Sequence, residues 1–516
     1  MKRAPIPFAC TLAIAFLSQL VLLAPAAGTQ APVMGAFPVA TERPIGRPFG
    51  VSLHWPTSEN LEDIDAPGTT SFARCEFGWA RTCNFIWSIM EPSAGDFSPL
   101  ADPAHYSNRF LAAVSSVGAR VLPLIDGPPG WLGDGPSSYI SPGHIPLLCN
   151  YVNKTVTRYQ NNMSKWELYN EPNNGWGKNY GTWGEFMALL IATAETIKRV
   201  NRSLDVIVGG LGGTRELEFL DYLVANLTAT PTSVPRFDTA RELFSGIAFH
   251  PYSSPAEELA KKLSEYDVIL SRYQWTIKDG ARHWITEIGS ETDSPRDGAG
   301  GFLVDPQREF AALMAKQMAI ATSWGVEGFN IWTYRDFSPP GTYGPEFGHC
   351  GIVYSDASWK GVTYAINWTN HHVGNGHSAL MPVAFPSPLT GIVARDSVLV
   401  GGKERWAIVA WNPAHQGIVN ARIDFGTGVS RAVVHDYSSN GTTELAVQAG
   451  ATGIEVQVGH EPVLLVIDCI SGGSCVLSIQ VDVLGGTFVG LVIASFMLLI
   501  GFIHVSTRRT RVHRPN

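Results

Sequence analysis

The sequence lacks several patterns that define well-known classes of protein. It has no Cys-x-x-Cys or His-Glu-x-x-His spacing, so nothing indicates a metal site, and we expect no cofactor. Its only dense run of Arg lies in the last ten residues and its formal net charge is −8, so no nucleic-acid partner is expected. Charged residues make up only 16% of the chain against 45% hydrophobic residues, which excludes a disordered protein and predicts large cores.

The two ends of the chain carry targeting patterns. Lys2 and Arg3 precede an apolar run, 13–23, and the small residues of Ala24-Pro25-Ala26, which predicts a signal peptide over residues 1–27. An uncharged stretch begins at Val483, and the sequence predicts a transmembrane helix over 483–505. Arginines dominate the tail, 506–516, which predicts a single-pass type I membrane protein with its ectodomain extracellular or lumenal. A removed lipid-anchor signal is the alternative, but such signals normally end in the apolar run.

The segment between these ends suits an oxidising compartment. It holds six Asn-x-Ser/Thr sequons, which predicts a glycoprotein: Asn153, Asn162, Asn201, Asn226, Asn367 and Asn440. After loss of Cys10 an even number of cysteines remains: Cys75, Cys83, Cys149, Cys350, Cys469 and Cys475. Cys469 and Cys475 flank a Gly/Ser loop and are candidates for a disulfide, whereas one or two of the others can be buried free thiols.

Two stretches far apart in the chain have the same form. Trp166 to Pro172 reads as a buried strand that ends on Asn170-Glu171 before a proline. His283 to Gly289 is a short apolar run that ends on Glu287 before a glycine. Two carboxylates at the tips of two strands can act as acid/base and nucleophile in glycoside hydrolysis.

These stretches belong to a series of eight apolar runs separated by helical segments. The pattern is typical of β/α units around a parallel sheet, and it predicts a (β/α)8 barrel over about residues 48–370. The runs begin at Gly50, Trp79, Arg120, Trp166, Leu204, Gly246, His283 and Gly328. The glycine cluster 209–213, which lacks the dinucleotide-binding spacing, is interpreted as a tight turn. A capping box predicts a helix that begins at Thr182, and Asp305-Pro306 predicts the beginning of another helix.

The pattern changes after Asn370. Residues 376–469 alternate apolar with polar residues between Gly, Asn and Ser turns, which predicts an antiparallel β-sandwich. We expect it to buttress the barrel and to accept a strand from the segment before Pro48. Residues 470–482 are expected to form a stalk.

The strand-end glutamates and their neighbours resemble those of the clan A glycoside hydrolases. The motif set is most similar to glycoside hydrolase family 39, the group of β-xylosidases, iduronidases and exopolysaccharide hydrolases. The matching stretches are 166–173, 249–252, 285–289 and 329–336. The resemblance implies net retention, with Glu171 as acid/base and Glu287 as nucleophile.

The resemblance also implies supporting roles for substrate-binding residues. Asn170 would bind the hydroxyl beside the anomeric carbon, Tyr252 would hold Glu287, and His250 would lie beside them. Arg81 would keep the nucleophile ionised, and Trp332 would lie under the reacting sugar. Each type also has an ordinary structural role, as a turn amide, core side chain or ion pair. Trp131 and Trp176 are candidates to line the site on the sequence alone, and Glu91 and Glu291 are competing strand-end acids.

The sequence therefore predicts an enzyme that hydrolyses extracellular or lumenal glycans. A membrane receptor that binds carbohydrate without cleaving it is one alternative, although a binding module would not need both glutamates. A transglycosylase that uses the same residues is the other. The sugar, the linkage and exo or endo action stay open.

Overall fold

The structure is a computed structural model of the chain. It describes residues 42–53, 71–133, 139–174, 182–213, 215–253, 255–275, 282–290, 306–337, 349–400, 403–413, 417–425, 428–448, 451–469 and 477–482. The predicted signal peptide, transmembrane helix, Trp176, Glu291 and Cys475 lie outside these ranges. No helix within them is long and apolar enough to span a membrane.

Eight parallel strands close into the predicted barrel. They are β2 (Phe49–Leu53), β3 (Trp79–Thr82), β4 (Arg120–Ile125), β5 (Lys165–Leu168), β6 (Asp205–Leu211), β7 (Gly246–Phe249), β8 (Arg282–Ile288) and β9 (Gly328–Ile331). Every strand predicted from an apolar run is present, and β2 pairs with β9 to close the ring. The barrel prediction is confirmed.

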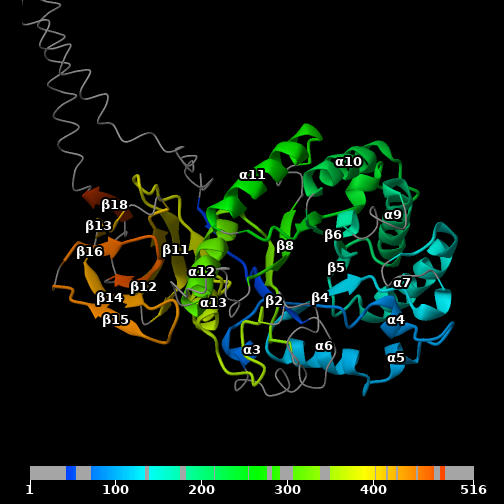
Figure 1. The fold of residues 1–516 in the computed structure, drawn as a ribbon, viewed down its shortest axis with the longest axis horizontal. Coiled ribbons are helices and arrows are strands. Elements are labelled where there is room, and N and C mark those ends of the chain that lie inside the picture. The colour runs from blue at the N-terminus through cyan, green and yellow to red at the C-terminus, as the bar shows by residue number, and fades with distance from the viewer. Residues whose placement is uncertain are drawn as a thin grey trace, which may run out of the picture. The chain divides into compact units, whose positions relative to one another are not determined.

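Helices connect the strands and surround them (Figure 1). Their bounds are α3 (Ser71–Arg74), α4 (Trp87–Met90), α5 (Ser98–Ala101), α6 (Tyr106–Ser116), α7 (Ile145–Tyr159), α9 (Trp183–Val200), α10 (Glu216–Ala229), α11 (Glu257–Arg272), α12 (Pro306–Trp324) and α13 (Gly361–His372). Thr182 and Glu185 form the predicted reciprocal cap of α9. Short 3-10 helices are η1 (Gly130–Leu132), η2 (Pro142–His144) and η3 (Ala240–Leu243).

The interior of the barrel is filled in layers. Trp79, Leu122, Ile207, Ala248 and Trp284 form one apolar layer from five strands. Side chains two residues apart lie on the same face of a strand. Arg81, His250 and Thr286, each two residues after a member of this layer, therefore also face the barrel interior, in the next layer toward the carboxyl ends of the strands. The barrel core therefore changes from apolar to polar toward the end where barrel enzymes build their sites.

Two antiparallel sheets form the second domain, as predicted. The larger has the order β1 (Arg43–Pro44), β10 (Ser378–Leu380), β11 (Thr390–Val400), β12 (Lys403–Trp411), β17 (Val463–Cys469), β14 (Val429–His435) and β15 (Thr442–Leu445). The smaller has the order β16 (Gly453–Val458), β13 (Val419–Phe425) and β18 (Leu477–Asp482). Strand β1 is the predicted addition from before Pro48. Arg308 of α12 pairs with Glu461, and Trp411 of β12 donates to Glu257 of α11, so the sandwich packs against barrel helices.

Two expectations need correction. The segment 470–482 was expected to be a stalk, but Leu477–Asp482 pairs with β13 along six residue positions and belongs to the sandwich. The glycine cluster was interpreted as a tight turn, but Gly209 and Gly210 lie inside strand β6. Among the cysteines, Cys75, Cys83 and Cys149 carry free thiols. A bond between Cys469 and Cys475 stays a prediction.

Candidate active site

Glu287 is aimed into the barrel mouth by an irregularity in β8. Thr286 is the inward-facing residue, and a regular strand would turn Glu287 away from the interior. The pairing of β8 with β9 shifts register between Ile285 and Ile288. Such irregularities re-aim a side chain and are common beside active sites. Glu287 is consequently buried and lies at the carboxyl end of the barrel.

Glu171 is held by an unusual backbone path after β5. Tyr169 and Glu171 both have positive φ angles, 68° and 45°. The left-handed region costs a residue with a side chain about 1–2 kcal/mol, so the surrounding contacts must hold this path. The Tyr169 N–H donates to Ile125 and the Glu171 N–H donates to Gly210, at 3.0 and 2.9 Å. These bonds to β4 and β6 place the carboxyl of Glu171 over the barrel.

The glycines in and directly after β6 make room for this loop. A Cβ atom on Gly209 would lie 1.6 Å from the carbonyl oxygen of Tyr169, and one on Gly210 would lie 1.9 Å from His250 Nε2. A Cβ atom on Gly212 would lie 2.6 Å from Glu171 Oε1. The cluster therefore exists for close approach of the backbone to the site.

Arg81 links the residues from three strands. Its Nε donates to Glu167 at 2.6 Å, and its Nη1 donates to Glu287 at 2.5 Å. Its Nη2 donates to Glu167 and to Asn170 Oδ1, at 3.2 and 2.9 Å. Because a guanidinium can only donate, the amide oxygen of Asn170 faces Arg81 and the Asn170 NH₂ group points elsewhere. Arg81 therefore both pairs with the expected nucleophile and orients the expected substrate ligand.

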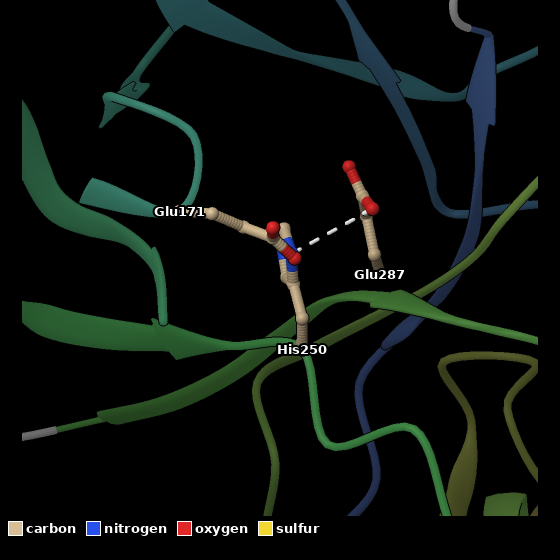
Figure 2. A group of neighbouring side chains, drawn as sticks. All are labelled: Glu171, His250 and Glu287. Atoms are coloured by element: carbon tan, nitrogen blue, oxygen red, sulfur yellow. Dashed lines mark hydrogen bonds and ion pairs between the residues drawn. The ribbon is translucent and has the colours of Figure 1, made fainter. Parts of the chain in front are cut away.

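His250 lies between the two glutamates (Figure 2). Its Nδ1 is 2.9 Å from Glu171 Oε1 and 3.6 Å from Glu287 Oε2. Its Nε2 is 3.0 Å from Thr286 Oγ1. The resemblance implied that His250 lies beside Glu287, which the structure shows, and its hydrogen bond is to Glu171. The Tyr252 hydroxyl donates to Glu287 Oε2 at 3.1 Å, as expected.

Local interactions set the ionisation of the site. Burial raises the pKa of Glu171, but the hydrogen bond and charge of His250 and the hydrogen bond from Asn174 outweigh it, so the pKa lies below its usual value. Burial and the negative charge of Glu287 raise the pKa of Tyr252 well above its usual value. Tyr252 therefore stays a donor at physiological pH.

Glu171, His250 and Glu287 also have the composition of a metal site. One ligand atom of each lies within 4.8 Å of the others. The surroundings do not fit a cation, because Arg81 and Tyr252 already direct donors at the two oxygens of Glu287. A metal ion there would have to displace a buried guanidinium and would lie beside its positive charge. The donor set fits proton transfer better than metal binding.

The remaining predicted residues lie at or beside the mouth. Trp332 follows β9, is 7% exposed, and packs its ring 5.6 Å from that of Phe337. Trp131 lies on the loop after β4, where its indole N–H donates to the carbonyl of Glu91. The Glu91 carboxylate accepts from Trp87 and from the Gly95 N–H, so this competing acid holds a turn.

Three residues that contribute to the site were not predicted from the sequence. Glu167 is fully buried under Arg81, and Thr286 bonds His250. Asp126 follows β4 and accepts from the backbone N–H of Asn170. The available signal was strand alternation, because Glu167 is an acid within a buried run and Thr286 is two residues beyond Trp284.

Comparison with solved structures finds the same fold in glycoside hydrolases. A family 39 glycoside hydrolase from the gut symbiont Bacteroides cellulosilyticus WH2 is 17% identical with a TM-score of 0.57, over 82% of this chain and 81% of that one. A monomeric beta-xylosidase from Caulobacter crescentus CB15 is 14% identical with a TM-score of 0.57, over 83% and 97%. The catalytic domain of a family 30 xylanase C from Talaromyces cellulolyticus is 12% identical with a TM-score of 0.53, over 83% and 98%. Comparison with protein-family profiles and with curated proteins gives no match.

Proposed function

We propose that the chain is a retaining β-glycoside hydrolase in which Glu287 is the nucleophile and Glu171 is the acid/base. The observation that carries the proposal is the approach of the two side chains, since an oxygen of each lies within 4.8 Å. Retaining enzymes hold their carboxyl groups about 5–5.5 Å apart, and inverting enzymes need about 6.5–9.5 Å for a water molecule. The shared fold with xylosidase and xylanase structures supports the same conclusion.

Glu287 is arranged to attack. Arg81 stabilises its ionised carboxylate from one side and the Tyr252 hydroxyl holds its other oxygen, so the side chain has a fixed orientation. In the first step a Glu287 oxygen bonds to the anomeric carbon while the bond from that carbon to the leaving oxygen breaks. The Glu171 proton goes to the leaving oxygen, and the product departs as an alcohol.

Glu171 then changes role. In the second step a water oxygen bonds to the anomeric carbon, the bond to Glu287 breaks, and Glu171 takes the water proton. The hydrogen bonds from His250 and Asn174 lower the pKa of Glu171 and so favour its ionised form, which is the form that can accept this proton. Bound sugar would displace water from a side chain that is 30% exposed, which favours the protonated form needed in the first step.

We further propose that the enzyme acts outside the cytosol as a single-pass membrane protein. The support is the signal-peptide pattern, the uncharged segment 483–505 and the six sequons. The substrates would be glycans or polysaccharides that reach the ectodomain. Xylose-containing glycosides are sensible first tests because the solved structures with this fold include a xylosidase and a xylanase.

The deciding experiment is to trap the intermediate with 2-fluoro-glycoside inactivators and map the labelled peptide. We expect the label on Glu287, none in Glu287→Gln, and loss of turnover of at least about 10³-fold in that variant. Glu242→Gln, an exposed glutamate before β7, is the matched control and should behave as wild type. A label elsewhere, or sugar binding without turnover or adduct, would overturn the assignment. Product analysis with an alcohol acceptor separates hydrolysis from transglycosylation.

A further inference from the structure

Asp126 is a rigidly placed carboxylate at the mouth of the barrel that has no role in the mechanism above. It follows directly after β4, and its Oδ1 accepts the Gly127 N–H at 2.7 Å. Its carboxylate also accepts the backbone N–H of Asn170. Its own carbonyl accepts the Trp87 N–H at 2.9 Å. Asp126 is thus held between the segments that follow β3 and β5.

The loop around Asp126 has little freedom. The Gly127 carbonyl accepts the Ser88 N–H at 2.8 Å, and Gly127 has a φ of +63°. A Cβ atom on Gly127 would lie 2.6 Å from Ile86 Cδ1. Asp126 as a residue is only partly buried at the mouth. Burial of its carboxyl raises the pKa of Asp126 to about 7, so the group can accept hydrogen bonds there without carrying a full charge. Side chains fixed in this way are suited to selecting among ligands, because little ordering is needed on binding.

The charges around Asp126 are unevenly matched. Asp126, Glu167, Glu171 and Glu287 form a group of carboxyls that interact with one another or with Arg81. The donors of Arg81 already go to Glu167, Glu287 and Asn170. Arg81 carries one positive charge against the two carboxylates of Glu167 and Glu287, so a substrate carboxylate would meet a net negative charge and a guanidinium whose donors are engaged. Sugar hydroxyls, in contrast, are good donors to these oxygens.

We propose that the sugar bound between Glu171 and Glu287 is uncharged and that Asp126 selects it by accepting hydrogen bonds from its hydroxyl groups. The inference rests on the proposed function and adds a substrate class to it, neutral glycosides rather than uronides. Asp126 is a binding residue in this scheme and takes no part in bond cleavage.

The test uses aryl β-glycosides in pairs that share configuration and differ only at C6, such as a glucoside and a glucuronide, together with a xyloside. In each pair with turnover, we expect the neutral member to exceed the uronide at least about 100-fold in kcat/KM. Asp126→Asn should lower kcat/KM for the neutral substrate about 10- to 100-fold and narrow the discrimination against the uronide. Monodeoxy substrates that lack the selected hydroxyl should show no further loss in the variant.

Asp102→Asn is the matched control. The Asp102 carboxylate also accepts a hydrogen bond from a backbone N–H, that of Ala104, but Asp102 is exposed. The substitution should leave the kinetics unchanged. A higher kcat/KM for the uronide than for the neutral substrate would overturn this inference. An equal loss of kcat/KM in Asp126→Asn with every deoxy substrate would overturn it too. Neither result would affect the labelling of Glu287. Binding of neutral monosaccharide and not of uronate, measured by tryptophan fluorescence without turnover, would support this inference and contradict hydrolysis. Binding of neither would overturn both.

Discussion

The barrel mouth and the sandwich core are both buried, but they are built from different residues. The sandwich core consists of apolar side chains such as Trp406, Ile423 and Leu465, and the small cavity inside it has an entirely apolar lining. The barrel mouth buries Arg81, Glu167 and other polar groups instead. Side chains in β13 alternate between buried and exposed, whereas β8 breaks its register to deliver Glu287.

The two regions gain their stability from different interactions. In the sandwich, stability comes from removing apolar surface from water, which is roughly proportional to area and insensitive to direction. At the mouth, each charge is tolerated only because a particular partner faces it. Loss of one group in the sandwich leaves a void, and loss of one group at the mouth leaves an uncompensated charge.

Arg81→Leu should have the largest effect. It leaves Glu167 and Glu287 buried beside each other without their guanidinium, so the free energy of unfolding should fall by about 3–5 kcal/mol. Arg81→Lys keeps the positive charge but loses the planar guanidinium, so its free energy of unfolding should lie between those of the wild type and Arg81→Leu. Urea unfolding followed by tryptophan fluorescence measures both. The exposed pair of Arg272 with Asp221 supplies the control, since Arg272→Leu should change stability little. Equal stability of Arg81→Leu and Arg272→Leu would remove the proposed distinction.

Leu465→Ala tests the other region. Leu465 is fully buried in the sandwich core, and truncation should lower the free energy of unfolding by about 2–5 kcal/mol. Because the void is in the sandwich, kcat of the folded fraction should not change. Ile418→Ala, at a side chain that is 67% exposed, is the control and should have little effect. A fall in kcat for Leu465→Ala at temperatures where the protein is folded would contradict the separation of the two regions.

Gly209→Ala probes the close approach at the mouth. The new methyl group would lie 1.6 Å from the carbonyl oxygen of Tyr169, and the backbone that holds Glu171 would have to move. Overpacking of this kind costs about 1–3 kcal/mol, and kcat should fall as well because the proposed acid/base, Glu171, is displaced. Gly46→Ala is matched, since nothing lies within 4 Å of its added atom. A variant with normal kcat would show that the loop tolerates displacement.

Prediction from the sequence succeeded where period and position decide the structure. The eight strands follow from apolar runs, and the approach of Glu171 to Glu287 follows from their strand-end positions, whereas their catalytic roles stay a prediction. Strand β18 was missed because a short strand past a Gly/Ser loop resembles a stalk. The partners of Arg81 and His250 depend on which strand tips meet across the barrel. Local patterns carry no such information.

The smallest predicted effect is a shift in the pH profile. The pKa of Glu171 lies below its usual value because the His250 hydrogen bond and charge, with the Asn174 bond, outweigh burial. Since kcat/KM reports the free enzyme and needs protonated Glu171, activity should fall as pH rises through that pKa, which gives an acidic optimum. His250→Gln removes the charge that favours ionised Glu171, so the basic limb should move to higher pH. His377→Gln, at an exposed histidine, should leave the profile in place. If the basic limb of the pH profile stays in place or moves to lower pH in His250→Gln, another group sets that limb. His250 would then support the barrel mouth only by packing, as a residue of the sandwich core does.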